Sequence, residues 1–196
     1  MHVLGNKERG VFYDHVRITK IVTGIVRLVN AHIWDPVTVS GHQLFTATLI
    51  VPKSDQKTIE AVDIAIKNAL KEGAAARGKY VVKAKRFLPW HDGDAAETHP
   101  LFAGSYYLNA SSLTAPSNVD HRVLPVTDPS LIASGCRIRA ALSFFPLFHD
   151  ANGGIGCELG SIQKAQIGEK IEIIPNISFE QFEGDFLRII QKHIAD

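Results

Sequence analysis

The feature that most constrains this fold is a hairpin signal in the last third of the chain. Residues 137–145 alternate between apolar and polar or small side chains, which is the period of a half-buried strand. Asp150-Ala151-Asn152-Gly153-Gly154 follows, a run of turn-forming residues that typically joins two antiparallel strands. Residues 155–165 are then predicted to form the returning strand. We therefore predict a long β-hairpin and a fold built mainly from sheet.

Further strands are predicted upstream of this hairpin. Residues 11–31 are rich in Val, Ile and Thr, which predicts one long strand or a pair of strands broken near Gly24. Asp35-Pro36 predicts a turn, and residues 44–51 and 102–110 predict two more strands. Many short strands with one inserted helix favour a small closed β-barrel.

The inserted helix is predicted between residues 54 and 73. Ser54 and Asp55 are good N-caps, and Gly73 is expected to end the helix. Between them, apolar side chains recur at helical spacing, at Ile59, Val62, Ile66, Ala69 and Leu70.

The composition changes after Pro175 to an apolar stripe among acidic residues. The stripe contains Phe179, Phe182, Phe186, Leu187, Ile190 and Ile194. We therefore expect two units, a barrel domain at residues 1–175 and an acidic, amphipathic C-terminal helix at residues 176–196.

The overall composition fits one globular core. Of the 196 residues, 45% are hydrophobic, which is enough for one substantial core without cross-links. The chain has two cysteines, Cys136 and Cys157, and no apolar stretch approaches the roughly 20 residues that cross a bilayer. We expect buried free thiols, no membrane association and a cytoplasmic location.

The formal net charge is only +1, but the charges separate by segment. Residues 53–86 hold nine basic and four acidic side chains, and every charge in residues 77–86 is positive. A basic face is therefore expected despite the neutral total.

Exposed aromatic and basic side chains on strands suit a single-stranded nucleic acid, because bases stack on rings and phosphates pair with cations. In residues 137–145, the polar face carries Arg137, Arg139 and Phe145. In Tyr106-Tyr107-Leu108, an inward Leu108 places Tyr106 in the core and Tyr107 outside. The other candidates lie beside prolines or in the basic segment, and they are Trp34, Lys53, Lys83, Lys85, Arg86 and Trp90.

A metal-dependent nuclease or phosphoesterase is the alternative, since clustered imidazoles and carboxylates hold cations that activate water. Its candidate ligands are His91, Asp92, Asp94 and His99. These residues flank a glycine turn, where Asp is expected for local hydrogen bonds, and no second cluster supplies further ligands. The sequence also has neither a P-loop nor a recognisable catalytic triad. We therefore expect a non-enzymatic protein without metal or cofactor.

An ordered set of short motifs resembles a family of phage single-stranded DNA-binding proteins that have an OB-fold and were long catalogued only as a domain of unknown function. The resemblance covers about residues 24–170. The motifs are Val26-Arg27-Leu28 with Asp35-Pro36, Thr48-Leu49-Ile50-Val51-Pro52-Lys53, Asp92-Gly93-Asp94, Gly104-Ser105-Tyr106-Tyr107-Leu108-Asn109-Ala110, Pro125-Val126-Thr127-Asp128-Pro129, Ser134-Gly135-Cys136, and Gly154-Ile155-Gly156 with Ile162-Gln163-Lys164.

The resemblance implies an OB-type closed barrel that binds displaced single strands without sequence preference during phage replication or recombination, in the host cytoplasm. It implies DNA contacts at Lys53, Tyr107, Arg139 and Phe145. Arg137 stands where members of the family often have an aromatic side chain, which exchanges stacking for charge.

The C-terminal segment supports a third hypothesis, a protein-interaction module. Members of the family often end in an acidic, flexible tail, whereas this chain has an apolar stripe that includes Phe179, Phe182, Phe186 and Ile190. The expected partners of the stripe are phage or host replication and recombination proteins. The sequence is also compatible with a homodimer.

Overall fold

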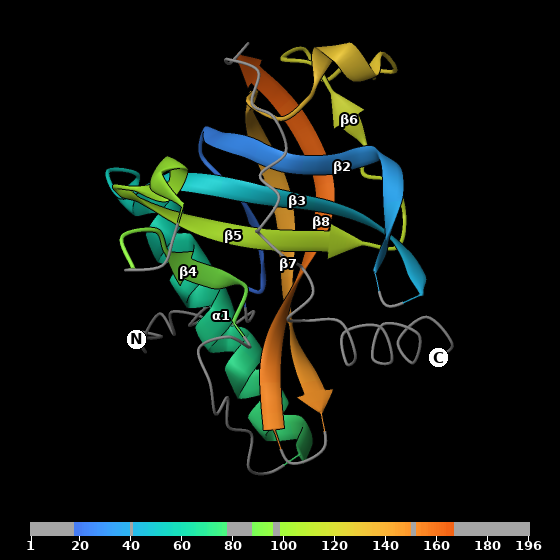
Figure 1. Ribbon diagram of the computed structural model, residues 1–196. Helices are drawn as coiled ribbons and strands as arrows, with labels where there is room; N and C mark the ends of the chain where they lie inside the picture. Colours follow the sequence, from blue (N-terminus) through green and yellow to red (C-terminus); the bar gives the residue numbers. More distant parts are fainter. Residues whose placement is uncertain (1–17, 40, 78–87, 96–98, 150–151, 167–196) are drawn as a thin grey trace, which may run out of the picture.

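The computed structural model describes residues 18–39, 41–77, 88–95, 99–149 and 152–166 (Figure 1). The predicted mainly β character with one inserted α-helix is confirmed. The elements are β1 (Lys20–Val22), β2 (Val26–Val39), β3 (His42–Pro52), α1 (Gln56–Arg77), β4 (Trp90–Asp92), the 3-10 helix η2 (Pro100–Phe102), β5 (Ser105–Ser112), β6 (Asn118–Val119), the 3-10 helix η3 (Pro129–Leu131), β7 (Arg137–His149) and β8 (Asn152–Gln166).

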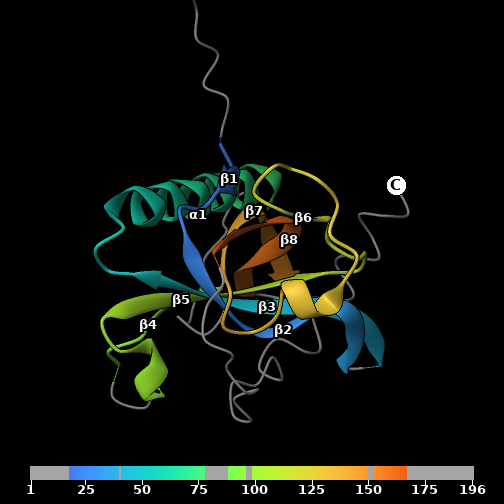
Figure 2. The ribbon, with the colours of Figure 1, turned by 90° about the horizontal axis from the view of Figure 1, so that it is seen from above.

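Strand pairing follows a path that returns to its start. β7 pairs with β2, β2 with β3, and β3 with β5, all antiparallel. β5 then pairs with β8 in parallel, and β8 pairs with β7 over most of the length of both strands, which confirms the predicted hairpin. β1 extends the pairing along β7, β4 lies beside β5, and β6 lies beside β8. α1 packs mainly against β7 and runs along one side of the strands (Figure 2).

One core fills the space between the strands and α1. On β7 the predicted alternation is confirmed, because Ile138, Leu142 and Phe144 are buried while Arg137 and Arg139 are exposed. Each fully buried Leu or Ile contributes about 1.5–3 kcal/mol of hydrophobic stabilisation. The inward side chains from the other elements include Val26, Leu28, Leu49, Val51, Val62, Ala65, Ala69, Leu108, Leu159 and Ile162.

The start of α1 is fixed by side-chain hydrogen bonds. Asp55 caps the helix, since its Oδ1 accepts from the Thr58 N–H at 3.2 Å. The Thr58 Oγ1 donates to Asp55 Oδ2 at 2.6 Å and accepts from the Gly24 N–H at 2.8 Å. The helix start therefore holds the β1–β2 turn, where the predicted break near Gly24 is confirmed.

The prediction that the helix ends at Gly73 is wrong. α1 continues to Arg77, and Gly73 is buried within it. A helical glycine costs about 0.5–1 kcal/mol relative to alanine, but three alanines follow it, and alanine is the strongest helix former.

The predicted turn at Asp35-Pro36 is also wrong, because β2 continues through both residues to Val39. The β2–β3 register shifts between Val29 and His32 and again between His32 and Val37, so Pro36 lies in an irregular stretch. Such a stretch tolerates proline, which has no N–H for the ladder.

Both cysteines are buried free thiols, as predicted. Burial, with a smaller effect of Glu158, raises the pKa of the Cys157 thiol. No helix in the described ranges combines the length and the apolar composition that a membrane crossing requires.

Four predictions fall wholly or partly outside the described residues. They are the first part of the strand predicted at residues 11–31, which covers residues 11–17, the basic side chains of Lys83, Lys85 and Arg86, the C-terminal helix at residues 176–196, and the domain boundary at residue 175.

Candidate nucleic-acid interface

A row of register partners crosses the outer face of the sheet. Arg27 on β2 pairs with Arg137 on β7 and with Ile50 on β3. Ile50 pairs with Tyr107 on β5, which pairs with His91 on β4. Register partners project to the same side of a sheet, and the chain neighbours Leu28, Leu49 and Leu108 point into the core, so these five side chains face outward. We call Arg137, Arg27, Ile50, Tyr107 and His91 the cross-strand row.

The β4–β5 end of the row is aromatic. The rings of His91 and Tyr107 are stacked, with centroids 4.9 Å apart and an interplanar angle of 23°. Phe102 lies against the Tyr107 ring at 4.4 Å and packs beneath it with Val29 and Ile50. Tyr107 is half-buried, and burial raises the pKa of its hydroxyl and lowers the pKa of His91. Both rings are therefore neutral at pH 7, and together with Phe102 they form an aromatic stack of the kind against which bases pack.

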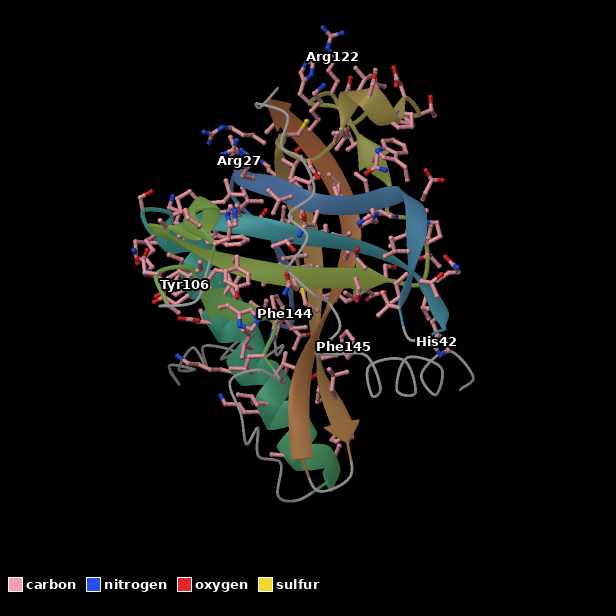
Figure 3. The ribbon with its side chains drawn as sticks, viewed as in Figure 1. Arg27, His42, Tyr106, Arg122, Phe144 and Phe145 are labelled. Carbon is pink, nitrogen blue, oxygen red and sulfur yellow. The ribbon has the colours of Figure 1, made fainter. Side chains whose placement is uncertain are left out.

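A second aromatic pair lies on the other side of β5. Trp90 and Tyr106 are stacked, with centroids 4.9 Å apart and an interplanar angle of 20°. Tyr106 is on the Leu108 side of β5, as predicted, but it is half-buried rather than enclosed in the core (Figure 3). The Lys53 Nζ lies 5.1 Å from its ring centroid. Trp90 also packs against the main core, so it supports β4 as well as the stack.

Lys53 is bound by two carboxylates. Its Nζ lies 2.6 Å from Asp92 Oδ1 and 2.7 Å from Asp94 Oδ2, and Asp94 Oδ1 accepts from the Gly104 N–H at 2.7 Å. Hydrogen bonds with the two carboxylates raise the pKa of Lys53, and hydrogen bonds with Lys53 lower the pKa values of Asp92 and Asp94. We call Lys53, Asp92 and Asp94 the lysine clamp, because it ties the turn after β4 to the end of β3.

The alternative metal site does not assemble from its predicted ligands. Asp92 and Asp94 face Lys53, and the His99 Nδ1 accepts from the Leu101 N–H at 3.2 Å. Across the described ranges, no three His, Cys, Asp or Glu side chains come together as metal ligands would.

Phe145 lies apart from the row. It is six residues beyond Arg139, or about 20 Å along an extended strand. Its ring covers the backbone of Gly156, where an added Cβ would lie 2.5 Å from the Phe145 Cζ. It also packs against a small separate cluster of Val39, Leu44 and Leu147. The structure therefore joins Arg137 to Tyr107 through the row and leaves Phe145 elsewhere.

Trp34 has a structural partner. Its indole Nε1 donates to the Ile132 carbonyl oxygen at 2.8 Å, and its ring packs against the main core. This contact attaches the segment after η3 to β2.

The comparison with protein families decides where this chain belongs. A family described as the ssDNA-binding protein of Enterobacter phage Enc34 matches residues 19–185. The chain belongs to this family. A comparison with curated proteins gave no match.

Solved structures of single-stranded DNA-binding proteins from two bacteriophages have the same fold. A C-terminal truncation of the single-stranded DNA-binding protein from bacteriophage Enc34 is 21% identical, with a TM-score of 0.68 over 78% of this chain and 89% of that one. The Enc34 protein in complex with ssDNA is 19% identical, with a TM-score of 0.68 over 79% and 90%. The gp2.5 single-stranded DNA-binding protein of bacteriophage T7 is 14% identical, with a TM-score of 0.60 over 79% and 98%. The mainly β architecture with one helix is thus the fold of these proteins.

Three residues of this surface were not predicted from the sequence: Arg27, His91 as a stacking ring, and Phe102. A signal was present for Arg27, because it lies between Val26 and Leu28 and alternation with these apolar neighbours points it outward. His91 and Phe102 had no such signal, since only the β4–β5 pairing and the η2 turn bring them to Tyr107.

The lysine clamp leads to a prediction about salt dependence. Changing Lys53 to Gln together with Asp94 to Asn keeps the net charge and breaks the clamp. We expect single-stranded DNA affinity to fall while the slope of log affinity against log salt stays unchanged, because the Lys53 ammonium is already paired with Asp92 and Asp94 and holds the turn after β4 in place. Arg139→Gln is the control, and it should reduce the magnitude of the slope by about 0.7, the value for one phosphate contact on a single strand. A matching loss of slope in the double variant would show that Lys53 does contact phosphate.

Proposed function

We propose that this protein binds single-stranded DNA without sequence preference, along the cross-strand row. The observation that carries the proposal is the register that aligns two arginines with two stacked rings across the outer face. Cations that follow the phosphates and rings that stack on successive bases are the two requirements of single-strand binding. Membership of the Enc34 family supports the proposal.

The pairing path supports an OB-type closed barrel as the scaffold. Three antiparallel strands, β2, β3 and β5, lead to a parallel pairing of β5 with β8, and β7 lies between β8 and β2. This pairing order supports a small Greek-key barrel, because it is the order expected of the OB-fold, whose outer face carries oligonucleotides.

The proposed role is protection and organisation of single strands in phage replication or recombination, in the host cytoplasm and without catalysis. The lysine clamp supports the absence of catalysis, because it occupies the carboxylates that a metal would need. The expected protein partners are phage or host replication and recombination proteins that bind the C-terminal segment.

A fluorescence-anisotropy titration tests the proposal. The protein is titrated against labelled oligo-dT and a duplex of equal length, at low and moderate salt and without metal. We expect tight binding to oligo-dT, weaker binding to the duplex, and a logarithm of affinity that falls linearly with the logarithm of the salt concentration. Equal binding to both ligands, or affinity independent of salt, would contradict it.

A further inference from the structure

The turn at residues 120–124 is held rigidly by its own hydrogen bonds. The Asp120 Oδ1 accepts from the backbone N–H groups of Arg122 at 2.7 Å and Leu124 at 2.9 Å. The Asp120 N–H donates to the Leu124 carbonyl oxygen at 2.9 Å, and the Val123 N–H donates to the Asp120 carbonyl oxygen at 3.0 Å. Backbone hydrogen bonds lower the pKa of Asp120, so its carboxylate stays charged inside the turn. We call residues 120–124 the tip.

The tip holds an apolar residue in an unfavourable conformation on the surface. Val123 has φ = 65°, in the left-handed region that β-branched residues rarely adopt. Its side chain is 67% exposed, and that of Leu124 beside it is 56% exposed. Backbone strain of this kind costs about 1–3 kcal/mol and clusters at ligand-binding sites. No burial of Val123 or Leu124 within the protein compensates for this strain, which indicates that these side chains serve a ligand.

A path of positive charge connects the tip to the cross-strand row. Arg139 lies two residues after Arg137 on the same face of β7 and pairs with Gln163 on β8. Gln163 pairs with Val119 on β6, and its Nε2 donates to the Asp120 carbonyl oxygen at 3.4 Å. Arg122 extends from the tip at the upper end of the molecule, well away from Phe145 (Figure 3).

The exposed cations of this path are available for a ligand. Arg122, Arg137 and Arg139 are exposed and form no ion pair with the other described residues. Followed along the curved surface of the strands, the path from Tyr107 to Val119 crosses five strand spacings and one two-residue step, a contour of about 30 Å. This length agrees with the roughly 4–16 nucleotides that one OB-fold covers.

We propose that the tip is a terminal nucleotide subsite, where Arg122 pairs with a phosphate and Val123 and Leu124 pack against a base. The inference rests on the proposed function and extends it, because it adds a contact outside the cross-strand row that only a strand long enough to follow the path reaches. An aliphatic surface accepts any base, which suits binding without sequence preference.

The test compares oligo-dT of increasing length, from about 4 to 16 nucleotides, in anisotropy titrations of the full chain. The two variants are Val123→Asn and Arg122→Gln. Asparagine adopts the left-handed conformation readily, so Val123→Asn removes the apolar side chain without disturbing the turn. Ile64→Asn is the matched control, since Ile64 is 50% exposed on α1.

We expect all variants to equal the unchanged protein on the shortest oligonucleotides that bind. On the longer ones, Val123→Asn should lose about fivefold in affinity, while Ile64→Asn loses none. Arg122→Gln should lower the magnitude of the salt slope by about 0.7 on the longer strands only. The midpoint temperature of thermal unfolding of Val123→Asn should be no lower than that of the unchanged protein, because asparagine relieves the backbone strain.

Two results would overturn the inference, and they distinguish failure of the tip subsite alone from failure of the proposed function. If the unchanged protein binds long oligo-dT and the tip variants bind it equally well at every length, the tip is not a subsite and the proposed function stands. If the unchanged protein binds no oligo-dT of any length, the proposed function fails and the tip subsite fails with it.

Discussion

Tyr107→Ala is expected to lower the affinity for single-stranded DNA by roughly 5- to 150-fold, since one base stack on an aromatic ring contributes about 1–3 kcal/mol. Tyr107 is the central ring of the aromatic end, between His91 at 4.9 Å and Phe102 at 4.4 Å. Its loss therefore opens the aromatic stack and leaves His91 without the ring that supports it against a base. Anisotropy titration with oligo-dT measures the change directly.

Two controls separate stacking from packing in this experiment. Tyr107→Phe keeps the flat ring and should retain most of the affinity, since burial keeps the hydroxyl of Tyr107 neutral and the ring does the stacking. Tyr107→Leu restores apolar volume over Phe102 without a flat ring, so it should unfold like the unchanged protein and bind as weakly as Tyr107→Ala. Full affinity in Tyr107→Leu would show that bases do not stack at this position.

Local patterns predicted most of the strands because those signals act over a few residues. The alternation around Ile138 and the turn at residues 150–154 were enough to predict the β7–β8 hairpin. The N-cap at Asp55 likewise located the start of α1 correctly. Local signals failed at Pro36 and Gly73, where pairing with β3 and packing of α1 override the residue's own preference.

The candidate site was harder to predict, because its residues are assembled by strand register. Period-2 alternation correctly placed Tyr107 and Arg139 on outer faces. Alternation could not show that Arg137 and Tyr107 lie in the same row, with Arg27 between them. That arrangement depends on strand pairings between distant segments of the chain. The same limit explains Phe145, whose outward face was predicted but whose position along β7 separates it from Tyr107.

Lys53 illustrates how a long-range contact changes the interpretation of a residue. A lysine at a strand end beside a basic segment suggests a phosphate contact. The β4–β5 pairing brings Asp92 and Asp94 to it from about 40 positions further along the chain, so its charge is balanced within the protein. No charge count over a sequence window detects such a contact.

Gly93→Ala is expected to lower both the stability and the DNA affinity. A Cβ at this position would lie 2.1 Å from the Phe102 carbonyl oxygen and 2.6 Å from that of Ser105. Both are backbone atoms, so the turn itself must move and break the hydrogen bond from the Gly93 N–H to the Ser105 oxygen. Overpacking of this kind costs about 1–3 kcal/mol in the free energy of unfolding, measured by urea denaturation.

The affinity should fall in the same variant because the Gly93 turn fixes the position of β4, which carries His91 of the cross-strand row. The turn follows β4, so its displacement shifts His91 from Tyr107 and separates Asp94 from Lys53. Gly41→Ala is the control, because Gly41 has φ = 81° and nothing lies within 4 Å of an added Cβ. It should lose about 1–2 kcal/mol from backbone strain alone and bind oligo-dT normally. If Gly93→Ala loses stability but keeps full affinity, the position of β4 does not matter for binding, and the row must end at Tyr107.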